Sequence, residues 1–257
     1  MLEIACFSAP SALAAARSGA TRIELCADYA AGGVTPELST LEHILHDLNK
    51  NKDNDNSKSN SSNSSQHIPI TIMIRPRGGN FHYTDTEFAQ MQDAITLFKP
   101  LASGFVFGIL EKEPENEGAS ESAKKQRWRV DTTRCTALVR LAAPRPCTFH
   151  RAIDEADSLL DAVEVAVSCG FARVLSSGCA NSGALQGVEA LCQVQQRFGT
   201  CIEVIAGGGI RSTNVAEIKR TTGVHWVHSA AVTRAGSEEV DQNEVGRIRD
   251  VLVSMTC

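Results

Sequence analysis

Short apolar runs alternate with amphipathic stretches along almost the whole of this chain, and that alternation constrains the fold more than any other feature. The stretches between the runs carry apolar residues at helical spacing, as Leu38, Leu41 and Leu45 do. The expected strands are Leu2–Phe7, Arg22–Cys26, Ile70–Ile74, Gly104–Leu110, Pro146–His150, Arg173–Ser176, Cys201–Ala206 and His225–His228. Strands that alternate with helices in this way predict a parallel sheet.

The number of these strand–helix units decides how the sheet is closed. Eight units in 257 residues predict an α/β protein with a (β/α)8 TIM barrel, formed by residues 1–257 as a single domain. The alternative is an open doubly wound sheet, which would carry a glycine-rich dinucleotide turn after its first strand. That turn reads Ser8-Ala9-Pro10-Ser11 here and contains no glycine, so the barrel is favoured.

Two polar segments interrupt the alternation. Residues 49–67 are dominated by Asn, Ser, Lys and Asp, and residues 111–130 are polar and charged. A segment with almost no apolar side chains cannot offset the entropy lost on ordering. We therefore expect the first segment to be a disordered surface insertion and the second to be another insertion within the same domain.

Composition argues against several classes of function. The formal net charge is −5 and the isoelectric point is near 5.8, whereas nucleic-acid-binding domains are usually basic. No apolar run approaches the roughly 20 residues that a membrane span needs. Glu3 stands where a secretory signal would carry basic residues. We expect a cytosolic protein without a nucleic-acid or membrane partner.

The chain has nine cysteines, with no CxxC pair and no repeated spacing. This pattern favours reduced, buried thiols over a disulfide scaffold. It also gives no indication of a zinc site made from close Cys and His pairs.

Polar residues and glycines stand at the carboxyl ends of the expected strands, where barrels of this type carry their functional groups. They are Cys6, Glu24 with Cys26, Arg75 with Arg77, Gly108, His150 with Arg151, Ser176 with Ser177, Gly207 to Gly209, and His228 with Ser229. An unpaired charge is costly to bury, so a ring of this kind predicts a ligand site. A structural ion-pair network is the alternative.

Strand parity indicates which of these side chains meet. Alternate residues of a strand face opposite sides, so Glu24, Arg75 and His150 are expected to converge near the barrel axis. Glu24 or His150 would act as a general acid or base, since histidine titrates near neutrality and burial raises the pKa of a glutamate. Lysine is absent from the strand ends, which argues against Schiff-base chemistry.

The same ring predicts an anion site. Glycines after the seventh strand allow backbone N–H groups to approach a ligand, and arginines clamp carboxylates and phosphates. The anion-binding candidates are Arg75, Arg77, Arg151, Ser176, Gly207, Gly208, Gly209, His228 and Ser229. They indicate a small phosphorylated or carboxylated metabolite as the ligand.

Six stretches of the chain together resemble those of the CutC copper-homeostasis family. They are Arg22–Cys26, Gly32–Pro36, Ile74–Gly79, Thr148–Asp154, Arg173–Gly178 and Gly207–Ile210. The resemblance implies a cytosolic TIM barrel that self-associates as a dimer or tetramer and handles copper, with proposed binding of Cu(I). The copper ligands that it implies are Cys6 and Cys26. Thiolates suit Cu(I), and neighbouring parallel strands lie about 4.8 Å apart. If Glu3 and Ala5 face the barrel interior, Cys6 faces the helices unless the strand end twists.

Two interpretations therefore stay open and do not exclude each other. The first is a Cu(I)-binding homeostasis protein without turnover. The second is a barrel enzyme or sensor that binds a small anionic metabolite at its mouth.

Overall fold

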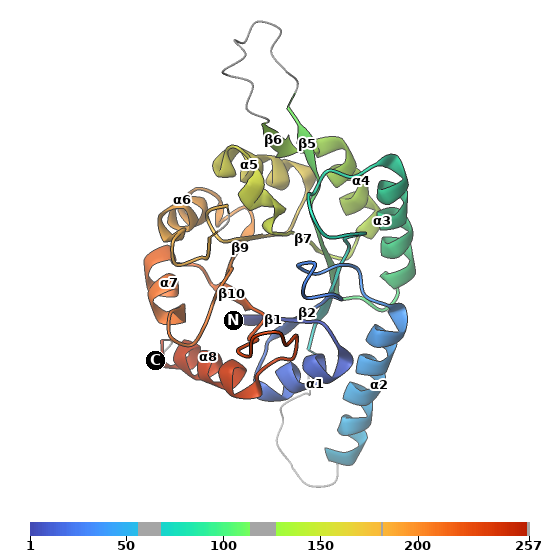
Figure 1. The fold of residues 1–257 in the computed structure, drawn as a ribbon, viewed down its shortest axis with the longest axis vertical. Helices are drawn as coiled ribbons and strands as arrows, with labels where there is room; N and C mark the ends of the chain where they lie inside the picture. The colour runs from blue at the N-terminus through green and yellow to red at the C-terminus, as the bar shows by residue number, and fades with distance from the viewer. Residues whose placement is uncertain (56–67, 114–126, 181, 256–257) are drawn as a thin grey trace, which may run out of the picture.

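Eight parallel strands close into a barrel in the order β1-β10-β9-β8-β7-β4-β3-β2, with helices around the outside (Figure 1). The structure is a computed structural model that describes residues 1–55, 68–113, 127–180 and 182–255. The barrel strands are β1 (Leu2–Cys6), β2 (Arg22–Leu25), β3 (Ile70–Met73), β4 (Gly104–Phe107), β7 (Cys147–Phe149), β8 (Arg173–Ser176), β9 (Glu203–Gly207) and β10 (Trp226–Ser229). The predicted (β/α)8 barrel is confirmed.

One helix follows each barrel strand. These helices are α1 (Ala9–Ser18), α2 (Leu38–Asp55), α3 (Asp85–Phe98), α4 (Thr132–Ala142), α5 (Leu159–Cys169), α6 (Val188–Phe198), α7 (Val215–Thr222) and α8 (Gln242–Ser254). Five of them begin after a residue whose side chain accepts a hydrogen bond from a first-turn N–H group, namely Ser8, Thr84, Asp131, Ser158 and Asp241. Such caps satisfy donors that the helix itself leaves free.

The two faces of the barrel wall have different chemistry. Ile4 of β1 and Ile23 and Leu25 of β2 are completely buried in the large core between the strands and the helices. The interior instead holds the charged side chains Glu3 and Arg22, which are also buried. The inner face of the wall therefore carries charged groups that are buried and paired with one another.

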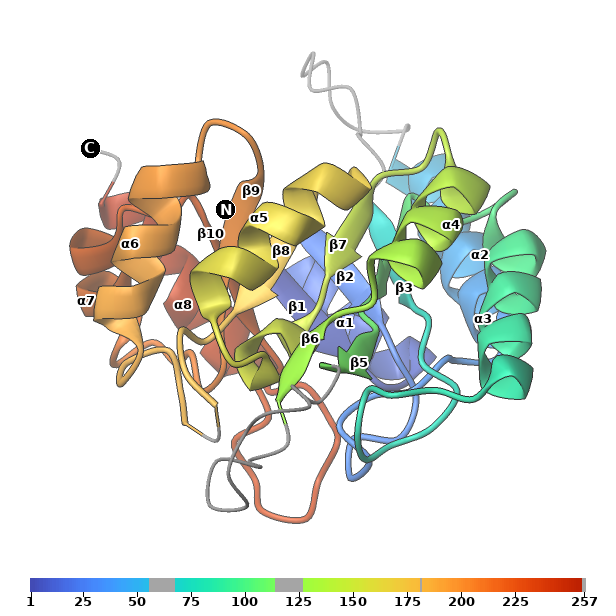
Figure 2. The ribbon, with the colours of Figure 1, turned by 90° about the horizontal axis from the view of Figure 1, so that it is seen from above.

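The connections that follow the strands gather at one end of the barrel, which forms its mouth (Figure 2). A short antiparallel hairpin there, β5 (Leu110–Lys112) with β6 (Trp128–Val130), was not expected from the sequence. A 3-10 helix, η2 (Arg151–Glu155), was also not expected. None of the helices in the described ranges is both long and apolar enough to cross a membrane.

Both polar segments differ in part from expectation. Residues 49–55, expected from their composition to be disordered, continue α2, because a helix already formed over its apolar stripe extends at little cost. The hairpin accounts for residues 111–112 and 128–130. Residues 56–67 and 114–126, which make up most of the two predicted insertions, lie outside the described residues.

Candidate functional site at the barrel mouth

A cavity of about 340 Å³ lies at the carboxyl ends of the strands. Most of the residues predicted from the sequence line it, namely Glu24, Cys26, Arg75, His150, Arg151, Gly208, Gly209, His228 and Ser229. Cys6, Arg77, Ser176 and Gly207 are not part of its lining. The structure thus brings polar side chains from distant segments of the sequence together in one pocket.

Glu24 and His228 form the charged floor of this cavity. Glu24 is 2% exposed, and its Oε2 lies 3.4 Å from His228 Nε2. The other carboxylate oxygen, Oε1, is buried without a hydrogen-bond partner. Burial raises the pKa of Glu24 to about 7; the charge of Glu3 adds to this effect, while His228 and Arg22 oppose it.

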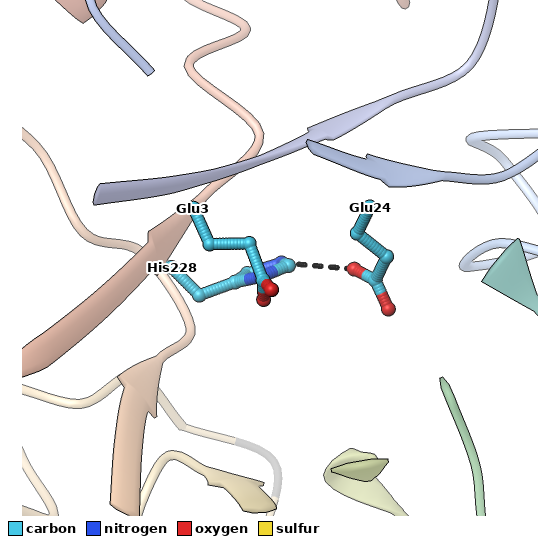
Figure 3. Close-up of side chains that lie close together, drawn as sticks. All are labelled: Glu3, Glu24 and His228. Carbon is cyan, nitrogen blue, oxygen red and sulfur yellow. Dashed lines mark hydrogen bonds and ion pairs between the residues drawn. The ribbon is translucent and has the colours of Figure 1, made fainter. Parts of the chain in front are cut away.

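Glu3 contacts the second ring nitrogen of His228, and the three side chains lie close together (Figure 3). His228 Nδ1 lies 2.7 Å from Glu3 Oε1, and Glu3 is also paired with Arg22. Burial alone would raise the pKa of Glu3, but His228 and Arg22 outweigh it and hold that pKa at about 2. Burial lowers the pKa of His228, yet the carboxylates of Glu24 and Glu3 outweigh this, so the net shift is upward.

Arg75 holds the loops of the cavity wall together. Its Nη1 donates to the carbonyl oxygens of Ala31 and Gly33, both at 3.1 Å, and its Nη2 donates to that of Gly79 at 2.7 Å. The guanidinium also lies over the ring of Phe81, 4.6 Å from its centroid. These contacts use both Nη groups, and the buried Nε has no partner.

His150 is a neutral hydrogen-bond donor in this structure. Its Nδ1 accepts a hydrogen bond from the Ala152 N–H at 3.3 Å, which places the ring proton on Nε2. Burial, together with the charge of Arg75, lowers the pKa of His150 to about 3. Its Nε2 is buried without a partner. Of the two acid–base candidates, Glu24 therefore has the pKa closer to neutrality.

Arg151 lies against the glycine turn after β9. Asp154 accepts from Arg151 Nε at 3.0 Å, and Arg151 Nη2 donates to Ser177 Oγ at 3.0 Å. A Cβ atom on Gly208 would lie 3.3 Å from Arg151 Cζ. Gly208 also has a φ of 98°, which side chains rarely allow, so the sequence needs glycine here.

Three predicted anion ligands have other partners. Ser176 Oγ donates to Asp154 Oδ1 at 2.5 Å and is completely buried. Arg77 pairs with Glu87 and donates to loop carbonyl oxygens outside the cavity. Gly207 does not line the cavity, and a Cβ atom on it would lie 2.5 Å from a Leu175 methyl group.

The two cysteines that the family resemblance implies as copper ligands face opposite sides of the barrel wall. Cys6 packs in the helix-facing core, and its thiol donates to the Ile4 carbonyl oxygen at 3.7 Å. Cys26 packs with Met73 and Val106 on the inner face and lines the cavity. Burial raises the pKa of both thiols well above the ordinary range. The eight cysteines in the described ranges are all free thiols.

Sequence reasoning missed several residues of the site. Glu3 was assigned only to the barrel interior, although its partner His228 was a candidate. Asp154 and Arg211 were not selected, although each follows a predicted strand end within a few residues. Arg211 lines the cavity and donates to the Val232 carbonyl oxygen at 2.9 Å.

Comparison with known proteins assigns the chain to a family. A model of the CutC family matches residues 1–233. A copper homeostasis protein cutC homolog of Mus musculus is 35% identical over 232 residues, which cover 90% of this chain and 73% of that protein. A CutC family protein of Treponema denticola is 33% identical over 234 residues, which cover 91% and 82%.

Solved structures support the same architecture. The crystal structure of the putative copper homeostasis protein CutC from Streptococcus agalactiae has a TM-score of 0.73 at 24% identity, covering 91% of this chain and 99% of that one. Phosphoribosyl anthranilate isomerase from Thermotoga maritima has a TM-score of 0.58 at 12% identity, covering 98% of each chain. These two likenesses concern the fold alone. The family is shown by the model match over residues 1–233 and by the two relatives: this chain belongs to the CutC family.

Proposed function

We propose that this protein binds a small anionic ligand in the mouth of its barrel. The placement of Arg151 beside Gly208 carries the proposal. Asp154 and Ser177 occupy Nε and Nη2 of the guanidinium, while Nη1 donates to no acceptor among the described residues. A guanidinium fixed in this way is ready to bind a carboxylate or phosphate without first losing side-chain freedom.

Backbone and ring donors in the cavity wall support the same ligand class. Within the described ranges, the N–H groups of Gly209 and Ala230 donate to no acceptor, and both residues line the cavity. The Nε2–H group of His150 is also without an acceptor. Of these donors, the buried Nε2–H of His150 costs free energy when it is left unsatisfied, and a ligand oxygen would offset that cost.

The charges of the lining favour an anion. Arg75, Arg151 and Arg211 contribute positive charge, whereas Glu24 is the one carboxylate in the lining. An anionic group would therefore sit beside Arg151 and Gly208, with the rest of the ligand directed toward Glu24 and His150. The volume of about 340 Å³ is at the low end for ligand pockets, so a small metabolite fits best.

The test is whether the EDTA-treated protein binds inorganic phosphate and sulfate. Titration calorimetry and thermal denaturation measure this binding. We expect both anions to raise the melting temperature, and Arg151→Gln to remove the effect. Arg247→Gln is the matched control, because Arg247 also pairs with a buried acid three residues away, Glu244, but lies outside the cavity. Equal anion binding by the wild type and Arg151→Gln would contradict the proposal.

The names of the relatives support a role in copper homeostasis for this chain as well, with copper as its cargo. Cu(I) favours sulfur ligands, and the cavity wall offers Cys26 and Met73, which pack together. Cys6 would first have to leave the helix-facing core. We therefore infer that Cu(I) contacts the chain through Cys26 with Met73 as its neighbour, and that Cys6 serves as a core side chain.

A further inference from the structure

The spacing between His228 Nε2 and the buried Glu24 carboxylate is longer than a direct hydrogen bond usually is. His228 Nε2 and Glu24 Oε2 are 3.4 Å apart, whereas N–H···O distances centre on about 2.9–3.0 Å. On the opposite side of the same ring, Nδ1 approaches Glu3 to 2.7 Å. The ring is therefore held firmly by Glu3 and only loosely by Glu24.

That longer spacing matches two ligands of one tetrahedral cation. Metal–nitrogen and metal–oxygen bonds of about 2.1 Å, joined at a tetrahedral angle, place the two ligand atoms about 3.4 Å apart. One suitable atom each from Glu3, Glu24 and His228 lies within 4.8 Å of the other two. The cluster thus has room for an ion between the imidazole and the Glu24 carboxylate.

Glu3 gives the imidazole the orientation that a metal ligand needs. Its Oε1 accepts from the Nδ1 side of His228, so Nε2 is the ring nitrogen that faces Glu24 and that would bind a metal ion once the ion has displaced its proton. Arg22 pairs with the other oxygen of Glu3 and holds it in place. A carboxylate behind the imidazole is the usual outer partner of a histidine that binds a metal ion.

An independent observation points to a missing ligand at this place. Glu24 Oε1 has no hydrogen-bond partner, although the residue is 98% buried. Figure 3 shows this oxygen pointing away from both Glu3 and His228. Since Glu24 and His228 both line the cavity, an ion between them is reachable from the mouth. A buried acceptor without a partner is costly, and a cation held by both oxygens of the Glu24 carboxylate would remove that cost.

We propose that His228 Nε2 and Glu24 hold a divalent cation such as Zn²⁺, with Glu3 as the positioning residue and the remaining coordination positions facing the cavity. Nitrogen and oxygen donors suit borderline divalent ions, whereas Cu(I) favours sulfur. The site is therefore distinct from the proposed copper contact at Cys26. It does not depend on anion binding, although an oxygen of the anionic ligand would reach the open positions.

The experiment uses the full chain stripped of metal by a chelator and kept free of phosphate. Zn²⁺ is titrated by calorimetry, and Co²⁺ is followed by the visible absorption of its tetrahedral form. We expect one site that is weakened at least ~100-fold in His228→Gln and in Glu24→Gln. Glu3→Gln should weaken binding by about 10–100-fold, the usual effect of losing an outer partner.

A matched control separates this site from binding at the surface. His43 Nε2 lies 3.3 Å from Asp47 Oδ2 on α2, nearly the same spacing, but His43 is 60% exposed. His43→Gln should leave Zn²⁺ and Co²⁺ binding unchanged. Loss of binding in His43→Gln, or wild-type affinity in His228→Gln, would overturn the proposal.

The unmodified protein gives a second test if the buried variants fold poorly. Nitrogen NMR of the histidine rings should show one buried imidazole that shifts at Nε2 on addition of Zn²⁺ and keeps its proton on Nδ1. A spectrum in which only exposed histidines respond would reject the site. Zn²⁺ binding without phosphate binding, or the reverse, distinguishes failure of this inference from failure of the anion proposal.

Discussion

Asp154 holds the Arg151 guanidinium against the glycine turn after β9. Its Oδ2 accepts from Arg151 Nε at 3.0 Å, and the carboxylate also accepts from both the N–H and the hydroxyl group of Ser177. The 3-10 helix η2, which follows β7, contains both Arg151 and Asp154. It therefore holds the Arg151 side chain in a fixed position beside the end of the neighbouring strand β8.

Replacing Asp154 should therefore affect binding through Arg151. We expect Asp154→Asn to weaken phosphate binding about 10-fold and to lower the free energy of unfolding by roughly 1.5–3 kcal/mol, the range for hydrogen bonds to charged groups. Glu244→Gln, the counterpart at the Arg247 pair, should lower stability with unchanged binding. Calorimetry and denaturant unfolding measure the two effects. Unchanged phosphate affinity in Asp154→Asn would show that Arg151 does not depend on Asp154 for its position.

Gly208→Ala should abolish anion binding. Besides the strain of a φ of 98°, the new Cβ would lie 3.1 Å from the Ser177 Cβ and would displace Arg151. We expect a loss of at least ~1–2 kcal/mol of stability from the backbone alone. Gly236→Ala is the control, because its φ is 73° and nothing lies within 4 Å of the new Cβ. If both variants keep phosphate affinity, the glycine turn is not part of the site.

His150 should make the protein less stable as the pH falls. Its pKa is about 3 in the folded state and 6.5 when exposed, so the unfolded chain binds a proton that the folded chain excludes. The stability is fully present above pH 6.5 and decreases toward pH 3, by at most ~1.4 kcal/mol per pH unit.

Chemical denaturation at a series of pH values measures this contribution. His150→Gln should flatten the slope between pH 6 and 4, values that lie inside the window of about 6.5 to 3. The same substitution at His46, which is 61% exposed, should leave the slope as it is. Parallel curves for the wild type and His150→Gln would mean that His150 does not titrate as its burial requires.

Cu(I) affinity should depend on one of the two cysteines near the mouth. Cys26→Ala should lower Cu(I) affinity at least ~10-fold, because it removes a sulfur ligand from the cavity wall. Cys6→Ala should leave the affinity unchanged and cost stability, since Cys6 belongs to the helix-facing core. Competition with a Cu(I) chelator measures both. Equal losses in the two variants would instead support a shared site.

Sequence patterns predicted the barrel and the faces of its strands well, for a physical reason. Strand periodicity reports burial directly, so parity placed Glu24 and Cys26 inside the barrel; it placed Cys6 toward the helices only on condition that Glu3 and Ala5 face inward, while the family resemblance paired Cys6 with Cys26. The hairpin of β5 and β6 was missed because its short strands lie in polar surroundings and carry a weak periodic signal.

Hydrogen-bond partners were much harder to predict than positions. Arg75 stands at a strand end, but loop carbonyl oxygens brought together by the fold occupy its Nη groups. Ser176 likewise donates to Asp154, a partner that the fold brings close and that strand periodicity does not indicate. The pairing of Glu3 with His228 joins residues 225 positions apart, and it exists only because the first and last strands are neighbours in the closed wall.

That last contact has a consequence for biosynthesis. A growing polypeptide that has not yet added β10 lacks His228 and the closing edge of the cylinder, so its buried acids Glu3 and Glu24 remain open to water. The proposed cation site combines groups from the first two strands with one from the last, so that site can form only once the closing strand has joined the wall.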